Sequence, residues 1–156
     1  MKLQQRKGEI FLKVTIIEDP NINETEISIV CSKITSEIHD IVSKISAVGL
    51  TLTGEKEGET FLIPIKEIFY FESVDGNIFF YTENETYEAT AKLYKIEEEL
   101  KNLQFARISK TVIANLDKML SIKKTENSRL VATLINKEKL VVSRQYVPQI
   151  KKKLGV

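Results

Sequence analysis

From residue 61 onward, short runs rich in apolar, β-branched and aromatic residues, separated by turn signals, dominate the chain, a pattern typical of strands. Asp75-Gly76-Asn77 separates two of these runs and has the composition of a tight turn. Pro64 restricts the first run to a sheet edge or a strand end, because proline cannot donate to a neighbouring strand. The pattern predicts strands at 61–65, 68–73, 78–82, 86–91, 106–116, 119–125, 129–135 and 139–144.

Apolar residues recur at helical spacing in two other segments, 32–48 and 93–103. Two runs rich in β-branched residues, 10–17 and 26–30, precede the first of these helices and read as strands. The C-terminal segment after 146 is expected to end as a short basic helix or coil.

A change of composition at residues 51–60, where Gly54 and Gly58 lie among charged residues, is typical of a hairpin turn or a linker. We therefore expect an N-terminal strand–strand–helix unit at 1–52, followed by a β-rich domain with one short helix at 58–154. The predicted fold class is mainly β with α (α+β).

Composition excludes several classes of protein. The 156 residues are 42% hydrophobic and 29% charged, which is ordinary for a globular chain. No apolar run approaches the ~18 residues of a membrane span, and the first residues do not resemble a secretory signal. A single cysteine, Cys31, cannot build a disulfide framework, so we expect a reducing, cytoplasmic location.

The sequence offers little for catalysis. One histidine (His39) and one cysteine (Cys31) cannot supply the roughly four nitrogen or sulfur ligands of a zinc site. The chain contains no serine-hydrolase elbow, phosphate-binding loop or dinucleotide fingerprint. The acidic run Glu97–Glu99 is typical of a solvated helix face. We expect no enzymatic activity, no metal and no cofactor.

Charge is distributed unevenly, although the net charge is only +1. Residues 105–156 carry twelve Lys or Arg against three acidic residues, a net charge of +9. The remaining 104 residues carry eleven basic and nineteen acidic residues, a net charge of −8. A basic segment of this size indicates either a polyanion-binding surface or a solvated Lys-rich tail.

Two stretches of the basic segment combine apolar anchors with side chains that can bind nucleic acid. In 105–115, polar residues alternate with Ile108, Val112 and Ile113, and in 141–146 they follow Val141 and Val142. Arg and Lys bind phosphate or guanine edges, Asn can hold adenine, and Thr can donate to phosphate. The polar candidates are Arg107, Ser109, Lys110, Thr111, Asn115, Ser143, Arg144 and Tyr146.

At this point the sequence resembles the LytTR DNA-binding domain, the output module of LytR/AlgR-type bacterial response regulators. Four motifs follow one another in the order typical of that family. They are IKEIFYFESVDGNIFFYT (65–82), KLYKIEEEL (92–100), FARISKTVIANLDKM (105–119) and VVSRQYVPQIKK (141–152). No single motif is specific to the family, but the four motifs in this order, over this length of chain, are.

The resemblance implies an elongated set of small antiparallel sheets with one short helix. It also implies a sequence-specific transcription regulator that inserts loops into successive major grooves. The DNA contacts that it assigns to this chain are Asn77, Ile78, Lys92, Arg107, Lys110, Thr111 and Arg144, and Arg107 is assigned either a phosphate contact or a role in bracing the loop. Ser109, Asn115, Ser143 and Tyr146 are assigned either DNA contacts or structural roles.

The chain also departs from the family pattern. Ser109-Lys110-Thr111 stands where the family often has His-Arg-Ser, and lysine lacks the bidentate fork of arginine. About 55 residues precede the resemblance, fewer than the roughly 120 of a receiver domain, so the chain resembles stand-alone members without a receiver. Those members imply a homodimer on repeated double-stranded DNA sites and, by family analogy, a membrane-protein regulator.

The N-terminal unit is then the natural dimerisation or regulatory element. Its apolar helix face (Ile34, Ile38, Ile41 and Ile45) either pairs with a partner or packs on its own two strands. An alternative function is an interaction or sensor module, such as an anti-activator, that keeps the fold without strong DNA binding. A flat salt dependence on arbitrary duplex DNA would favour that alternative.

Overall fold

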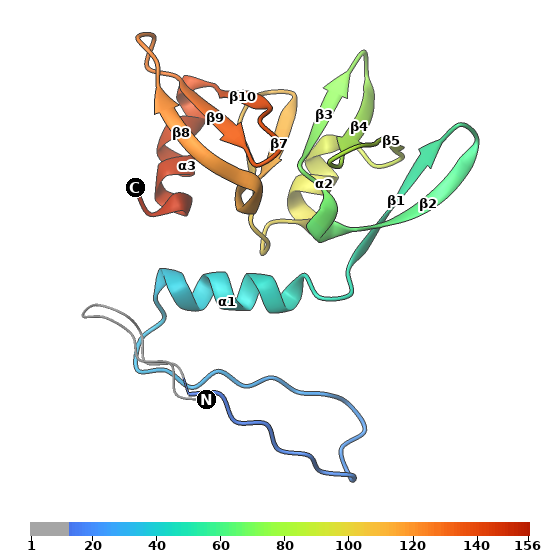
Figure 1. The fold of residues 1–156 in the computed structure, drawn as a ribbon, viewed down its shortest axis with the longest axis vertical. Helices are drawn as coiled ribbons and strands as arrows, with labels where there is room; N and C mark the ends of the chain where they lie inside the picture. Colours follow the sequence, from blue (N-terminus) through green and yellow to red (C-terminus); the bar gives the residue numbers. More distant parts are fainter. Residues whose placement is uncertain (1–12) are drawn as a thin grey trace. The chain divides into compact units, whose positions relative to one another are not determined.

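The structure, a computed structural model, describes residues 13–156 (Figure 1). The chain divides into two units, Met1–Ser32 and Lys33–Val156. Each unit is described separately below.

The first unit contains no strand within its described residues, 13–32. The predicted strands at 13–17 and 26–30 are therefore wrong, while residues 10–12 lie outside the described part. The backbone hydrogen bond found here, from Ile22 N to Asp19 O over 3.1 Å, closes a turn. β-Branched side chains favour a strand only when a neighbouring strand covers them, and here Val30 is 97% exposed.

Helix α1 (Ser36–Ser46) belongs to the second unit. It confirms the helix predicted over 32–48, but it begins only after Thr35, whose backbone is extended. Gln104 Nε2 donates to Asp40 Oδ1 over 2.6 Å, which ties the helix to the β-rich part of the chain. The division after Ser32 thus separates α1 from the segment that was predicted to form a unit with it.

A seven-stranded antiparallel sheet forms most of the second unit, in the order β2-β1-β5-β4-β3-β7-β6 (Figure 1). Its strands are β1 (Thr51–Lys56), β2 (Glu59–Pro64), β3 (Tyr70–Val74), β4 (Asn77–Tyr81), β5 (Thr86–Ala89), β6 (Phe105–Arg107) and β7 (Val112–Asn115). β2 is an edge strand that ends at Pro64, as the proline predicts. β1 was not predicted as a strand. It forms a hairpin with β2 through the turn at Glu57-Gly58.

A second, three-stranded sheet follows in the order β10-β9-β8. Its strands are β8 (Met119–Lys124), β9 (Leu130–Leu134) and β10 (Lys139–Val142). Short 3₁₀ turns η1 (Ile65–Glu67), η2 (Leu116–Lys118) and η3 (Arg144–Tyr146) connect strands or lead into the last helix.

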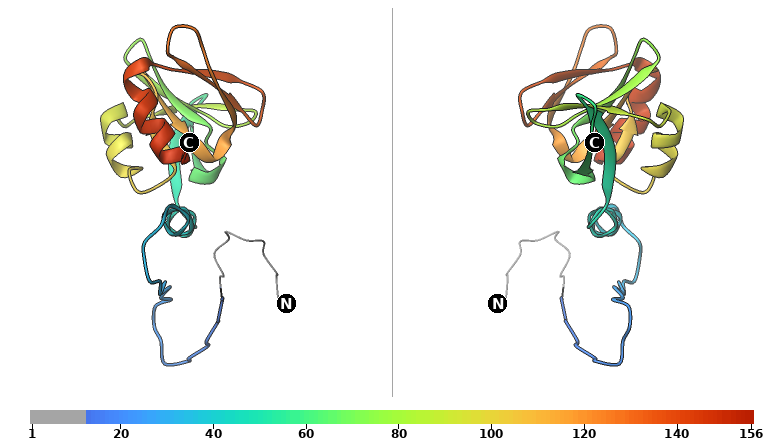
Figure 2. Two further views of the ribbon diagram at one scale, coloured as in Figure 1. Left: turned by 90° about the vertical axis from the view of Figure 1, so that its left-hand side faces the viewer. Right: turned by 90° about the vertical axis from the view of Figure 1, so that its right-hand side faces the viewer.

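Two further helices, α2 (Leu93–Glu99) and α3 (Val147–Leu154), lie on the same side of the β-structure in both views of Figure 2. α3 confirms the short basic helix at the C-terminus. Lys153 Nζ on α3 donates to Phe105 O over 2.8 Å. Because desolvation penalises the charged ammonium, burial lowers the pKa of Lys153.

The central strands are buried on both faces. Phe71 and Ile113 belong to a core cluster that includes the apolar side chains of α2. Their neighbours Tyr70 and Ala114 belong to a second cluster, shared with the three-stranded sheet and α3. Alternate residues of one strand thus enter different cores, which explains why 68–71 is continuously apolar.

The α+β fold class is confirmed, with mostly antiparallel sheets and a few short helices. Within residues 13–156, no helix is both long and apolar enough to cross a membrane.

Candidate nucleic-acid interface

A hollow of about 480 Å³ brings together six of the predicted polar residues. It lies where the β6–β7 loop meets the segment after β10, and Ser143 N donates to Ile108 O over 2.8 Å to join the two. The hollow is lined by Ser109, Lys110, Thr111, Arg129, Ser143, Arg144, Gln145 and Tyr146.

The β6–β7 loop has a buried anchor and an exposed tip. Ile108 is only 1% exposed, and its N–H donates to Val112 O over 3.0 Å. Thr111 N donates to Ser109 Oγ over 3.1 Å, so the serine hydroxyl closes the loop on itself. Lys110 and Thr111 are exposed at this tip, where they can meet an external ligand.

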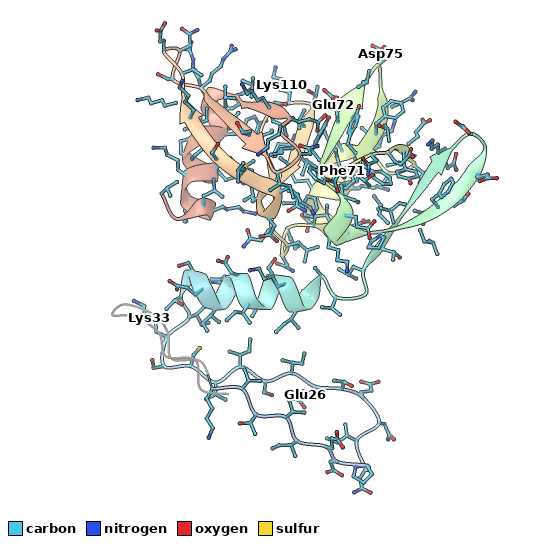
Figure 3. All side chains as sticks on the ribbon, in the orientation of Figure 1. Glu26, Lys33, Phe71, Glu72, Asp75 and Lys110 are labelled. Carbon is cyan, nitrogen blue, oxygen red and sulfur yellow. The ribbon has the colours of Figure 1, made fainter. Side chains whose placement is uncertain are left out.

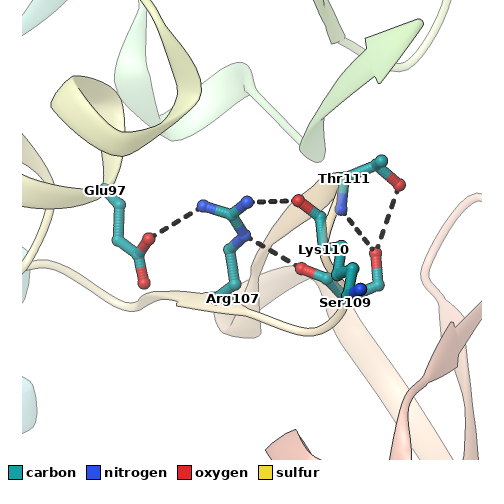
Figure 4. Close-up of polar contacts among 5 residues, drawn as sticks. All are labelled: Glu97, Arg107, Ser109, Lys110 and Thr111. Carbon is teal, nitrogen blue, oxygen red and sulfur yellow. Dashed lines mark hydrogen bonds and ion pairs between the residues drawn. The ribbon is translucent and has the colours of Figure 1, made fainter.

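Arg107 supports this loop from within the protein (Figure 4). Its Nε donates to Ser109 O over 2.9 Å, and a terminal guanidinium nitrogen donates to Lys110 O. The other terminal nitrogen pairs with Glu97 Oε2 on α2 over 3.0 Å. The Arg107 side chain is 18% exposed, and each of its three nitrogens has a protein acceptor.

The opposite wall of the hollow follows β10. Arg144 begins η3 and is exposed, so its guanidinium can reach solvent beyond the wall. Tyr146 is partly buried against the second core cluster, and its N–H donates to Ser143 O over 2.9 Å. The turn therefore has a packed tyrosine and a projecting arginine.

Arg129 lines the hollow but was missed by sequence reasoning. It stands just before β9, in the hairpin that follows β8, and is exposed. The only sequence signal for Arg129 is its position in the basic segment 105–156, because none of the four family motifs covers residues 120–140. With Lys110 and Arg144 it gives the hollow three cationic side chains and no acidic one.

The β3–β4 turn lies beside the β6–β7 loop, because Ser73 N donates to Thr111 O over 2.8 Å. Asp75 and Lys110 appear at this end of the sheet in Figure 3. Asn77 is exposed after this turn. The side chain of Ile78, however, is 5% exposed and packs in the core, so a DNA contact at this position, which stays a prediction, is left to its backbone.

Lys92 and Asn115 lie outside the hollow. Lys92 is exposed at the N-terminus of α2. Asn115 is 4% exposed, its Nδ2 donates to Ile68 O, and its Oδ1 accepts from Asp117 N over 3.1 Å. Of the two roles considered for Asn115, these contacts match the structural one.

No group of three or more His, Cys, Asp or Glu side chains in the described part of the chain could hold a metal ion. The geometry offers cationic and hydroxyl groups on loops, which suits binding of a polyanion.

Comparison with known proteins identifies the family of the domain. The profile of the LytTr DNA-binding domain family matches residues 58–155. An uncharacterised HTH-type transcriptional regulator of Staphylococcus aureus is 24% identical over 147 residues, 93% of this chain and 99% of that protein. The sensory transduction protein LytT of Bacillus cereus is 29% identical over 133 residues, covering 85% of this chain but only 50% of LytT.

A solved structure has the same fold. The LytTr DNA-binding domain of a methyl-accepting/DNA response regulator from Bacillus cereus aligns with a TM-score of 0.65 at 23% identity. The alignment covers 68% of this chain and 97% of that domain. This likeness confirms the fold.

The fold and the basic hollow define a β-rich domain with exposed cationic side chains on its loops and turns. The chain belongs to the LytTr DNA-binding domain family. This is a family of DNA-binding domains rather than a class of enzymes, and membership supports DNA-binding regulation of transcription.

Proposed function

We propose that the protein is a sequence-specific transcription regulator that reads double-stranded DNA with the loops around the hollow. The observation that carries the proposal is the meeting of Lys110, Arg129 and Arg144 in one hollow whose lining includes no acidic side chain. Such a surface attracts phosphates, and its loops can enter a groove and contact base edges.

The residues around the hollow are assigned two roles. Lys110, Thr111 and Arg144 project from loops and turns, so they read base edges in a major groove. Ser143 and Tyr146 are partly buried beside the hollow, and with Arg129 they contact phosphate.

A neighbouring groove is contacted by a second set of residues, Asn77 and Lys92. Both are exposed, and the turn that bears Asn77 is tied to the β6–β7 loop by the Ser73–Thr111 hydrogen bond. Contacts with successive grooves favour a homodimer on repeated sites about one helical turn apart. The proposal includes a cytoplasmic location and a membrane-protein regulator, the latter by family analogy alone.

The test is selection of binding sites from a random duplex library, followed by affinity measurements on the enriched sequence. Arg144→Ala should weaken binding to that sequence roughly 5- to 150-fold, the equivalent of ~1–3 kcal/mol. Lys66→Ala removes an exposed charge on η1, outside the hollow, and should leave affinity nearly unchanged.

Two results would overturn the proposal. One is an Arg144→Ala variant that binds as tightly as Lys66→Ala. The other is a wild-type protein that enriches no sequence and binds arbitrary duplex DNA with a flat salt dependence, which would favour an interaction module such as an anti-activator.

A further inference from the structure

We propose that Glu97 and Arg107 form a positioning pair that holds the β6–β7 loop in its DNA-reading shape from helix α2. The inference rests on the proposed function and deepens it. In this proposal Arg107 holds the backbone carbonyls of Ser109 and Lys110 in place (Figure 4). The β6–β7 loop contacts DNA, and Arg107 does not.

All three guanidinium nitrogens of Arg107 already have hydrogen-bond acceptors within the protein. Nε donates to Ser109 O, and the two terminal nitrogens engage Lys110 O and Glu97 Oε2. A phosphate contact by Arg107 would have to displace one of these acceptors. The planar fork of arginine suits the present arrangement, because one rigid group satisfies two successive loop carbonyls and a carboxylate.

The loop needs this support because backbone pairing in the sheet does not reach the carbonyls of Ser109 and Lys110. Strand pairing between β6 and β7 ends at Arg107 and Ile113, and the backbone bonds beyond it use Val112 O. The carbonyls of Ser109 and Lys110 turn toward Arg107 instead. Since the Lys110 carbonyl and side chain share one backbone unit, holding the carbonyl also sets the direction of the side chain.

Glu97 anchors the pair to a rigid element. α2 is fixed to the core through Leu93, Ile96 and Leu100, which are 7%, 1% and 6% exposed. The same helix begins at Lys92, a proposed DNA contact. The pair therefore connects two contact elements, the start of α2 and the β6–β7 loop, through one helix.

The sign of the Glu97 charge leads to a sharp test. A carboxylate close to a DNA-binding loop repels phosphate, so on electrostatic grounds its removal should strengthen binding. Under our proposal, Glu97→Gln instead weakens binding to the enriched sequence about 2- to 10-fold, because a neutral amide oxygen holds the Arg107 guanidinium less strongly than the carboxylate does. The matched control is Glu99→Gln, an exposed residue on the same helix with the same change of charge, which should bind at least as tightly as wild type.

Salt dependence separates positioning from direct contact. Loss of a phosphate contact lowers the slope of log affinity against log salt by about 0.9. Arg107→Lys keeps the charge but cannot make the three contacts, so it should weaken binding at an unchanged slope. Arg107→Ala should do the same. A slope lowered by about one in Arg107→Ala, or a Glu97→Gln variant that binds as tightly as Glu99→Gln, would overturn the proposal.

A readout without DNA keeps this inference distinct from the proposed function. In the free protein, Glu97→Gln should accelerate amide exchange at residues 109–111, while Glu99→Gln should not. If the wild-type protein binds no DNA but the exchange differs as described, the proposed function fails and the brace on the loop stands. Equal exchange in the two variants refutes the brace itself.

Discussion

Asn115 and Ile68 lie 47 positions apart in the sequence, and the Asn115 side chain joins them by donating from Nδ2 to Ile68 O over 2.8 Å. Both residues are buried, with Asn115 4% exposed and Ile68 0% exposed. The same side chain accepts from Asp117 N, so it also caps the η2 turn.

Asn115→Ala should therefore destabilise the fold. The substitution leaves the Ile68 carbonyl without its buried donor, and we expect a loss of ~1–3 kcal/mol in the free energy of unfolding, measured by urea titration. Asn127→Ala is the control, because Asn127 is exposed in the β8–β9 turn, and it should change stability by no more than about 0.5 kcal/mol. Equal stability of the two variants would contradict the structural role.

Gly54→Ala should destabilise the β1–β2 hairpin for a steric reason. A Cβ atom at this position would lie 2.7 Å from Tyr87 Cβ and closer still to the Phe80 ring. Overpacking of this kind costs typically ~1–3 kcal/mol. Thermal unfolding of the variant should show the loss.

A double-mutant cycle checks the cause of that loss. Phe80→Leu removes the ring atoms that the new methyl group would meet, so the cost of Gly54→Ala should be smaller in the Phe80→Leu background than in wild type. Strictly additive costs would show that the two side chains do not compete for space.

The sequence predicts those parts of the fold that are locally encoded. β3 and β4 follow from their aromatic and β-branched residues and from the turn at Asp75 and Gly76, both of which have positive φ. The edge position of β2 follows from Pro64, which cannot donate to a further strand.

Elements decided by distant partners could not be predicted. β1 contains Gly54 and mostly polar residues, and it is a strand because β2 and β5 pair with it. Conversely, residues 13–17 have the composition of a strand without a paired neighbour among the described residues. The site shows the same limit: motifs indicated Lys110 and Arg144, but Arg129 reaches the hollow only through the packing of the small sheet.

The buried Tyr70 and the partly buried Tyr81 predict a loss of stability at alkaline pH. Burial raises the pKa of Tyr70 and of Tyr81, and Glu72, which accepts from the Tyr81 hydroxyl over 3.3 Å, raises the pKa of Tyr81 further. Below ~10, the pKa of tyrosine in the unfolded chain, both hydroxyls keep their proton in the folded and in the unfolded protein, so ionisation costs no stability. Above it the unfolded state releases the proton first, and stability falls as pH rises toward the folded pKa.

Tyrosinate absorbance measures this directly. Of the five tyrosines, Tyr70 and Tyr81 should ionise late, together with unfolding. Tyr70→Phe should remove part of the late component, whereas Tyr94→Phe, at a position 65% exposed, should leave that component unchanged. A late component that survives in a Tyr70→Phe/Tyr81→Phe double variant would assign it to other residues.

Arg129→Ala should weaken DNA binding in a different way from Arg144→Ala. Arg129 is exposed at the rim of the hollow beside Lys110 and Arg144, and its proposed role is to neutralise a phosphate. Its removal should reduce affinity by a similar factor for enriched and for arbitrary sequences, and it should lower the salt slope by about 0.9. Arg129→Lys keeps the charge and should restore most of that slope. A loss confined to the enriched sequence would instead make Arg129 a base-reading residue, because phosphate contacts do not distinguish one sequence from another.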